Sequence, residues 1–141
     1  MKIEEHEKAY KEHLANIKKA VEEGIEENQR NIGYNVSQGS VELFAIYLHK
    51  LRLLQGSGDQ IDHRVFKSDN LIKKRIPFDF PPKQGILSLM KSIELERTAL
   101  CYGNRKPKNR IEKSIKSFNE LRKIINDNLG GLKYGKNAEK K

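Results

Sequence analysis

The sequence has a single cysteine, no tryptophan and only four prolines among its 141 residues. One cysteine, Cys101, excludes an internal disulfide and a zinc cluster held by several thiolates. No apolar run reaches the roughly 18 residues that a membrane helix needs, and the first residues lack the apolar centre of a signal peptide. We therefore expect a cytoplasmic protein, and the chain length suits one domain.

Motifs of common enzyme classes are also missing from the sequence. There is no P-loop, no glycine pattern of dinucleotide sites, no nucleophile elbow and no zinc motif of the His-Glu-x-x-His type. The four histidines lack the spacing of metal ligands, and we interpret His6 and His13 as part of a solvated helix face. We expect neither a metal nor a cofactor.

Charge is distributed unevenly along the chain, which has a formal net charge of +9. Residues 1–31 contain six Lys or Arg against eight Asp or Glu, whereas the remaining residues contain 22 against 11. A basic excess of this size favours an anionic partner, most commonly RNA or DNA. Solubility and ion pairing are the alternative explanation.

Apolar residues recur every three, four or seven positions from Ile3 to about Asn31, which predicts a long amphipathic helix. Gly33 and Asn35 are expected to end it. A second helix, capped by Ser37 or Ser40, should continue to residue 54. Apolar residues surround most of its axis, so we expect it at the centre of the fold.

The second half of the chain predicts further helices separated by an extended crossing. Residues 61–75 are weakly helical with a break near Ser68, and the prolines of residues 76–82 prevent a continuous helix there. That crossing should place Phe78 or Phe80 over an end of the core. Pro82 suits the first turn of the next helix.

The last helix should begin near Pro107 or Asn109 and end at Gly130-Gly131, before a frayed basic tail over residues 132–141. No stretch shows the alternation of a strand. The predicted fold class is all-α, an antiparallel helical bundle of four long helices plus a short one, in one domain over residues 1–131.

Arg97 lies within the apolar stripe of the helix predicted to follow Pro82, between Ile93 and Leu100. A guanidinium in such a place needs a partner, a ligand or an aqueous cleft. Glu94, three residues away, could supply a purely structural ion pair. The functional alternative is an anion site at the helix junction, built from Arg97, Tyr102, Arg105, Lys106, Lys108 and Arg110.

The stretch that carries this arginine is Glu96-Arg97-Thr98-Ala99-Leu100-Cys101-Tyr102-Gly103. It resembles the Arg-Asn-x-x-x-His-Gly junction of the HEPN superfamily, whose members are small all-α domains. The resemblance implies metal-independent RNA cleavage by the Arg and His of two paired protomers that face one cleft. Arg97 matches the family's arginine and Thr98 its polar neighbour, but Tyr102 occupies the histidine position.

The tyrosine changes the expected activity, because a phenol loses its proton only near pH ~10 and is a poor general base at neutral pH. Some members carry a tyrosine two positions after the histidine that a partner nucleotidyltransferase modifies, and Asn104 stands there in this chain. His49, on the predicted central helix, is the only candidate to replace the missing base.

These observations lead to one hypothesis and two alternatives. The hypothesis is a homodimeric HEPN-like protein with a basic cleft centred on Arg97 that binds RNA or a nucleotide without efficient nuclease activity. One alternative is a divergent, toxin-like ribonuclease that uses Arg97 with Tyr102 or His49. The other is a protein-interaction subunit that partners a nucleotidyltransferase.

Overall fold

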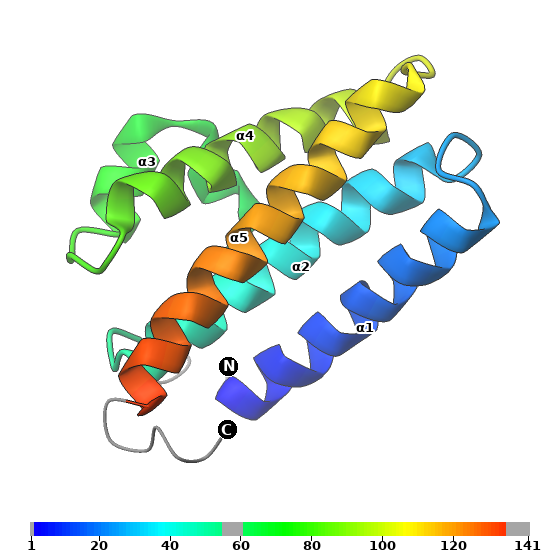
Figure 1. Cartoon of the computed structure of the whole chain (residues 1–141). Helices are drawn as coiled ribbons and strands as arrows, with labels where there is room; N and C mark the ends of the chain where they lie inside the picture. The colour runs from blue at the N-terminus through cyan, green and yellow to red at the C-terminus, as the bar shows by residue number, and fades with distance from the viewer. Residues whose placement is uncertain (1, 55–60, 135–141) are drawn as a thin grey trace.

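The computed structural model describes residues 2–54 and 61–134, with side chains up to residue 130. In these ranges the chain is all-helical and has no strand, as the periodicity predicts (Figure 1). None of the described helices is long and apolar enough to cross a membrane. The elements are α1 (Ile3–Glu23), α2 (Gln29–Lys50), the 3-10 helix η1 (His63–Lys67), α3 (Asp69–Arg75), α4 (Lys83–Cys101) and α5 (Lys108–Tyr134).

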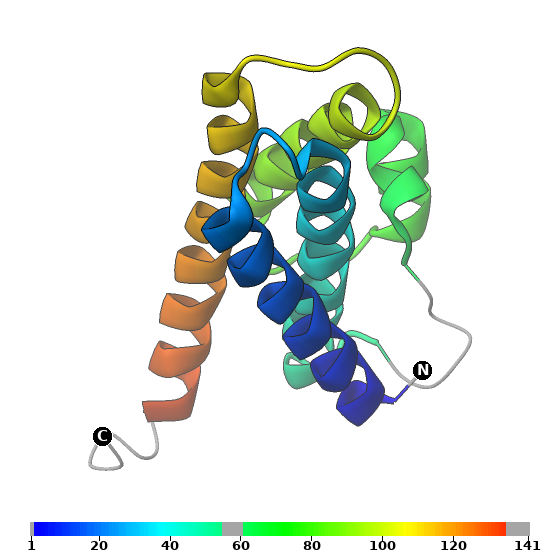
Figure 2. The ribbon, with the colours of Figure 1, turned by 90° about the vertical axis from the view of Figure 1, so that its right-hand side faces the viewer.

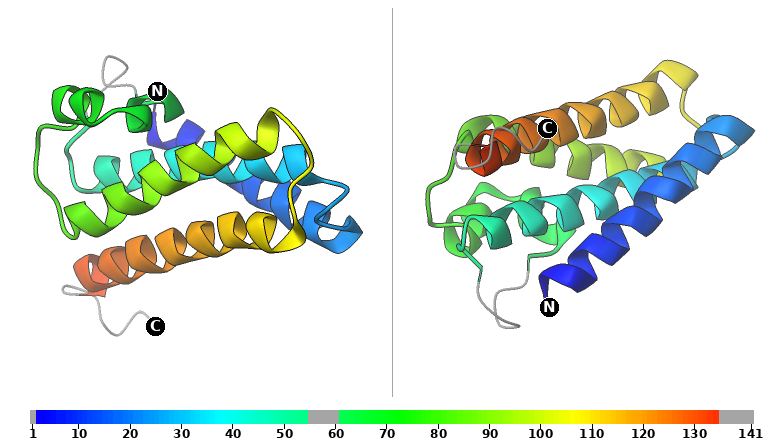
Figure 3. Two further views of the ribbon diagram at one scale, coloured as in Figure 1. Left: turned by 90° about the horizontal axis from the view of Figure 1, so that it is seen from above. Right: turned by 60° about the horizontal axis from the view of Figure 1, so that its bottom comes forward.

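Helix α2 occupies the centre of the bundle, as predicted, and contacts α1, α4 and α5 (Figure 2). Its apolar residues around Phe44 and Leu48 are fully buried in a core that extends from Ile17 of α1 to Ile125 of α5. Consecutive long helices run antiparallel, which is clearest for α4 and α5 (Figure 3). The predicted bundle of long helices with a short one is therefore observed, with η1 in addition.

The first helix is shorter than predicted, because the chain turns at Gly24 and not at Gly33. Gly24 has a φ of 127°, which favours glycine because a Cβ would be strained there. The second helix then begins at Gln29 and ends at Lys50, four residues before its expected end. The prediction that Gly33 and Asn35 end a helix was wrong.

Small residues in the first half of α2 serve packing. A Cβ added to Gly33 would lie 2.7 Å from the Cβ of Leu100 on α4, so only glycine allows this approach of the two helices. Ser37 and Ser40 are buried within α2 and cap no helix, contrary to the prediction. Local sequence made these residues resemble a turn, whereas they form a contact surface for neighbouring helices.

The two histidines of α1 lie at the interface with α2, so their assignment to a solvated face was wrong. Nδ1 of His6 lies 2.6 Å from Oε1 of Glu42, and Nδ1 of His13 lies 2.8 Å from Oδ1 of Asn35. Both histidines are half-buried. Asn35 and Glu42, both on α2, therefore form a polar row that faces α1.

The predicted break at Ser68 and the aromatic crossing are both confirmed. Oγ of Ser68 accepts a hydrogen bond from the backbone N–H of Leu71, which caps α3. Phe80 is buried and its ring centroid lies 5.5 Å from that of Phe44. Pro82 is the N-cap of α4, one position before the first turn in which it was expected.

Helix α5 begins at Lys108, between the two predicted starting points, but its predicted end was wrong. It continues through Gly130 and Gly131 to Tyr134. A glycine within a helix costs only about 1 kcal/mol relative to alanine, so it ends a helix only where the chain also turns. Residues 135–141, most of the predicted tail, lie outside the described ranges.

Candidate anion-binding site

Arg97 extends from α4 toward α2 and is held there by neutral groups. Its Nη1 donates hydrogen bonds to Oγ of Ser37 at 3.1 Å and to Oε1 of Gln38 at 2.9 Å. The guanidinium carbon lies 5.3 Å from the ring centroid of Tyr34, a cation–π distance. Nε of Arg97 is buried and has no hydrogen-bond partner within the described part of the chain. The side chain is thus oriented without being neutralised.

The structural ion pair between Arg97 and Glu94 does not form. Oε2 of Glu94 lies 2.9 Å from Nδ1 of His63 and 3.9 Å from Nζ of Lys67, both on η1. Oε1 of the other neighbouring carboxylate, Glu96, accepts a hydrogen bond from Nε of Arg110 at 3.0 Å. Among the described residues, no carboxylate lies within ion-pair distance of Arg97.

The loop after α4 is tied to the start of α2 through its backbone. Nε2 of Gln29 donates to the carbonyls of Leu100 at 3.1 Å and Asn104 at 3.2 Å, and Oε1 accepts from the backbone N–H of Lys106 at 2.7 Å. Arg30 donates to the carbonyl of Cys101 and, at 3.0 Å, to that of Gly103. These bonds hold the carbonyls on both sides of Tyr102.

The cations of the predicted patch bond to different parts of the fold. Arg105 donates to the carbonyl of Glu26 at 3.1 Å, over the turn between α1 and α2. Lys108 lines a groove between α1 and α5, and Arg110 pairs with a carboxylate of α4. Lys106 is half-buried, whereas Thr98 and Tyr102 are exposed. The hydrogen bonds and ion pairs of these side chains thus do not gather them around Arg97.

Three residues of α2 that the sequence reasoning missed lie beside Arg97 or its loop: Arg30, Tyr34 and Gln38. Their spacing of four places them on one side of the helix. The helix end wrongly predicted at Gly33 concealed this spacing, which would otherwise have indicated that the three residues share one side of a helix. We call the surface formed by Arg30, Tyr34, Gln38, Arg97 and Tyr102 the Arg97 face.

His49, the candidate to replace the missing base, lies far along α2 from the residues that contact Arg97. His49 follows Gln38 by eleven residues on α2, about 16 Å along the helix axis, and its ring centroid lies 5.3 Å from that of His6. The ring of His13 lies 6.0 Å from that of Tyr34, which also contacts Arg97. His13 is therefore closer to the Arg97 face than His49 is.

Cys101, next to Tyr102, reports on the electrostatics of this region. Burial raises the pKa of its thiol, and the positive charges of Arg97 and Arg30 oppose this increase. Its Sγ lies 3.8 Å from the carbonyl of Arg30. Two guanidinium groups therefore act on the same half-buried position between α2 and α4.

Metal-ligating groups do not gather elsewhere in residues 2–54 and 61–134: no three His, Cys, Asp or Glu side chains are arranged to hold an ion. Comparison with known proteins gives no match among family models, curated proteins or solved structures. Function must therefore be inferred from the residues and their contacts.

Proposed function

We propose that this chain is a HEPN-like helical protein that binds RNA through the Arg97 face and lacks efficient ribonuclease activity. The observation that supports it most is the partly buried guanidinium of Arg97, which has neutral neighbours and no carboxylate partner in the described structure. Such a charge is costly to bury unless an anion reaches it. A phosphate group of RNA is an anion that arginine binds well.

The aromatic side chains of the Arg97 face support RNA over a simple inorganic anion. Tyr34 is 45% exposed and Tyr102 is 65% exposed, so both rings can reach a bound molecule. Single-stranded RNA is recognised in large part by stacking of bases on aromatic rings beside positive charge. Arg30 is also exposed and adds a second guanidinium next to Tyr102.

The positions of the histidines favour binding without efficient cleavage. An exposed phenol, Tyr102, stands where the resembling family has its histidine, and phenols are poor bases at neutral pH. His6 and His63 lie beside the carboxylates of Glu42 and Glu94, away from Arg97. Only His13 lies near the Arg97 face, and its Nδ1 is engaged by Asn35.

A homodimer belongs to the same proposal. The resemblance to HEPN proteins implies that two copies pair with their motifs facing one cleft, and two Arg97 faces would double the positive charge on one RNA strand. Light scattering on the purified chain should therefore give a molar mass of two copies. A mass of one copy at all concentrations would contradict the dimer.

RNA binding can be measured by fluorescence anisotropy with a labelled single-stranded RNA of mixed sequence. Arg97→Ala should weaken binding about ten-fold or more, because it removes charged hydrogen bonds to phosphate. Arg64→Ala is the matched control, since Arg64 is exposed on η1 and pairs with Asp62. The affinity of the wild-type chain should fall as salt rises. Absent or salt-insensitive binding would contradict the proposal and favour the interaction subunit.

The absence of cleavage needs its own assay. Mixed RNA incubated with the chain in the presence of a metal chelator should remain intact. Cleavage that disappears in Arg97→Ala would overturn the binding-only proposal and support the divergent ribonuclease. In that case His13→Ala should abolish cleavage and His49→Ala should not, because only His13 lies near Tyr34.

A further inference from the structure

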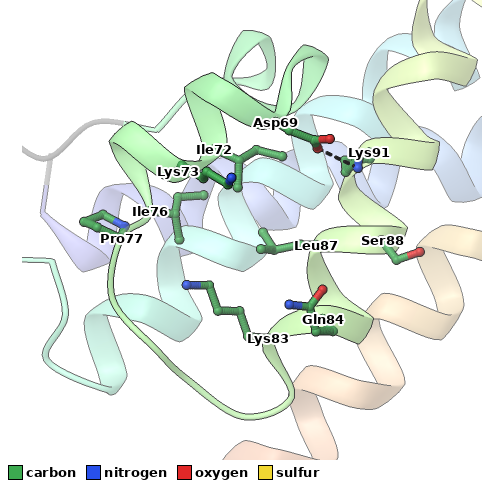
Figure 4. Close-up of a pocket in the computed structure, with 10 residues that line it drawn as sticks. All are labelled: Asp69, Ile72, Lys73, Ile76, Pro77, Lys83, Gln84, Leu87, Ser88 and Lys91. Carbon is green, nitrogen blue, oxygen red and sulfur yellow. Dashed lines mark hydrogen bonds and ion pairs between the residues drawn. The ribbon is translucent and has the colours of Figure 1, made fainter.

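A cavity of about 710 Å³ lies between α3 and the first half of α4, next to Pro77 at the start of the crossing that joins them (Figure 4). Its volume falls in the range of small-molecule sites. Three lysines line it, Lys73 from α3 and both Lys83 and Lys91 from α4.

The charges in this cavity do not balance. Lys91 is paired with Asp69, whose Oδ1 lies 2.7 Å from the lysine Nζ. Asp69 is the only carboxylate among the residues that line the cavity. Lys83 donates a hydrogen bond to the carbonyl of Phe78 at 2.7 Å, and no ion pair forms at Lys73 within the described structure. Three ammonium groups and one carboxylate leave a charge of +2.

The carboxyl group of Asp69 responds to this positive environment. Its pKa is lowered, first by the hydrogen bond and charge of Lys91 and additionally by the charge of Lys73. Figure 4 shows the ammonium end of Lys83 in the space between the two helices. Lys73 and Lys83, from different elements, thus both line the cavity without an ion-pair partner in the described structure.

Part of the cavity wall is apolar. Ile72, Ile76 and Leu87 line it, with exposed fractions of only 7%, 1% and 8%. A site that combines an apolar surface with a few charged groups suits an organic molecule with one charged end. An inorganic anion alone would leave this apolar part without a partner.

The cavity is separate from the Arg97 face. Lys91 precedes Arg97 by six residues, which places the two side chains about 120° apart around α4 and about 9 Å apart along its axis. Arg97 faces α2, whereas Lys91 bonds to the first residue of α3. A ligand in one site therefore does not use the residues of the other.

We propose that the cavity between α3 and α4 binds a small phosphate monoester with an apolar body. The dianionic phosphate group lies between Lys73 and Lys83 and matches the charge of +2. The apolar body lies on Ile72, Ile76 and Leu87. Lysines suit this role because a flexible ammonium group is a point charge that binds phosphate from several directions.

The test uses the full chain and three probes: 1-naphthyl phosphate, and its two halves, inorganic phosphate and 1-naphthol. Each is titrated while amide resonances are followed by NMR. We expect 1-naphthyl phosphate to shift the resonances of α3 and the first half of α4, and to bind more tightly than either half. If inorganic phosphate bound as tightly as the ester, the proposal of an organic ligand would be overturned.

Lys73→Gln is the decisive variant, because it removes charge from a side chain that makes no ion pair in the described structure. It should weaken binding of 1-naphthyl phosphate about ten-fold. Lys113→Gln, an exposed position on α5, is the matched control and should change nothing. Equal affinity in the two variants, or shifts confined to other helices, would overturn the proposal. Arg97→Ala should retain this binding, so failure of RNA binding and failure of this site are distinguishable.

Discussion

On the side of α4 that faces η1, the carboxylate of Glu94 is buried beside His63 and Lys67, whereas on the side that faces α2 the guanidinium of Arg97 meets only neutral groups. The two residues are one helical turn apart and of opposite charge. Their separate environments show that Glu94 belongs to the internal packing of η1 against α4. Arg97 has no such partner among the described residues, and its neighbours on α2 are neutral.

The largest expected effect is on the close contact between α2 and α4. Gly33→Ala should lower the free energy of unfolding by about 3 kcal/mol, because the added Cβ would lie 2.7 Å from the Cβ of Leu100. Gly85→Ala in α4 is the matched control: nothing lies within 4 Å of the added Cβ. It should raise the free energy of unfolding by about 0.5 to 1 kcal/mol. Urea denaturation measures both, and a similar sign for both variants would contradict this account of Gly33.

The next largest effect on the free energy of unfolding is expected on the side of α4 that faces η1. Glu94→Ala should lower the free energy of unfolding by about 2 kcal/mol, because it removes a charged acceptor from His63 and leaves a buried gap. Glu112→Ala, at an exposed position of α5, should change stability very little. If Glu94→Ala were as mild as Glu112→Ala, the pairing of Glu94 would contribute nothing to packing.

Arg97→Met tests the other side and should cost less stability. Methionine keeps much of the apolar contact with Tyr34 but loses the cation–π contact and the hydrogen bonds to Ser37 and Gln38, so we expect about 1 kcal/mol. RNA binding should nevertheless weaken about ten-fold or more, as for Arg97→Ala. A loss of stability larger than that of Glu94→Ala, with unchanged RNA binding, would make Arg97 a structural residue.

The smallest expected effect is on the reactivity of Cys101. Burial raises the pKa of its thiol, so less of the reactive thiolate is present and alkylation by iodoacetamide near neutral pH should be slower than for free cysteine. Arg97 lowers this pKa, so Arg97→Met should raise it and slow alkylation further. Arg64→Met should leave the rate unchanged. Mass spectrometry follows the reaction, and faster alkylation of Arg97→Met would contradict the electrostatic effect.

Much of the helical structure could be predicted because its signals are local. Apolar residues at helical spacing, the Ser68 cap and the prolines before α4 each act within a few residues. Gly33 and Gly130 misled the prediction because a glycine has the same local signal whether it ends a helix or lies inside one. The difference depends on a neighbour: Leu100 packs against Gly33 from 67 residues away.

The candidate site was predicted only in part for the same reason. Arg97 was identified because its position on an apolar stripe can be read from the helical period. Tyr34 and Arg30 were missed, and His49 was preferred to His13, because sequence spacing within one helix does not show which residues of another helix face it.

The sequence by itself determined an all-helical chain, a central apolar helix and one arginine on a face directed toward the interior, since each depends on periodicity within a single segment. Only the tertiary structure decided that Glu94 pairs with η1 and that Arg97 pairs with no described carboxylate. The physical reason is that ion pairing depends on which helix faces meet. The packing of the bundle brings η1 to one side of α4 and the uncharged side chains of α2 to the other.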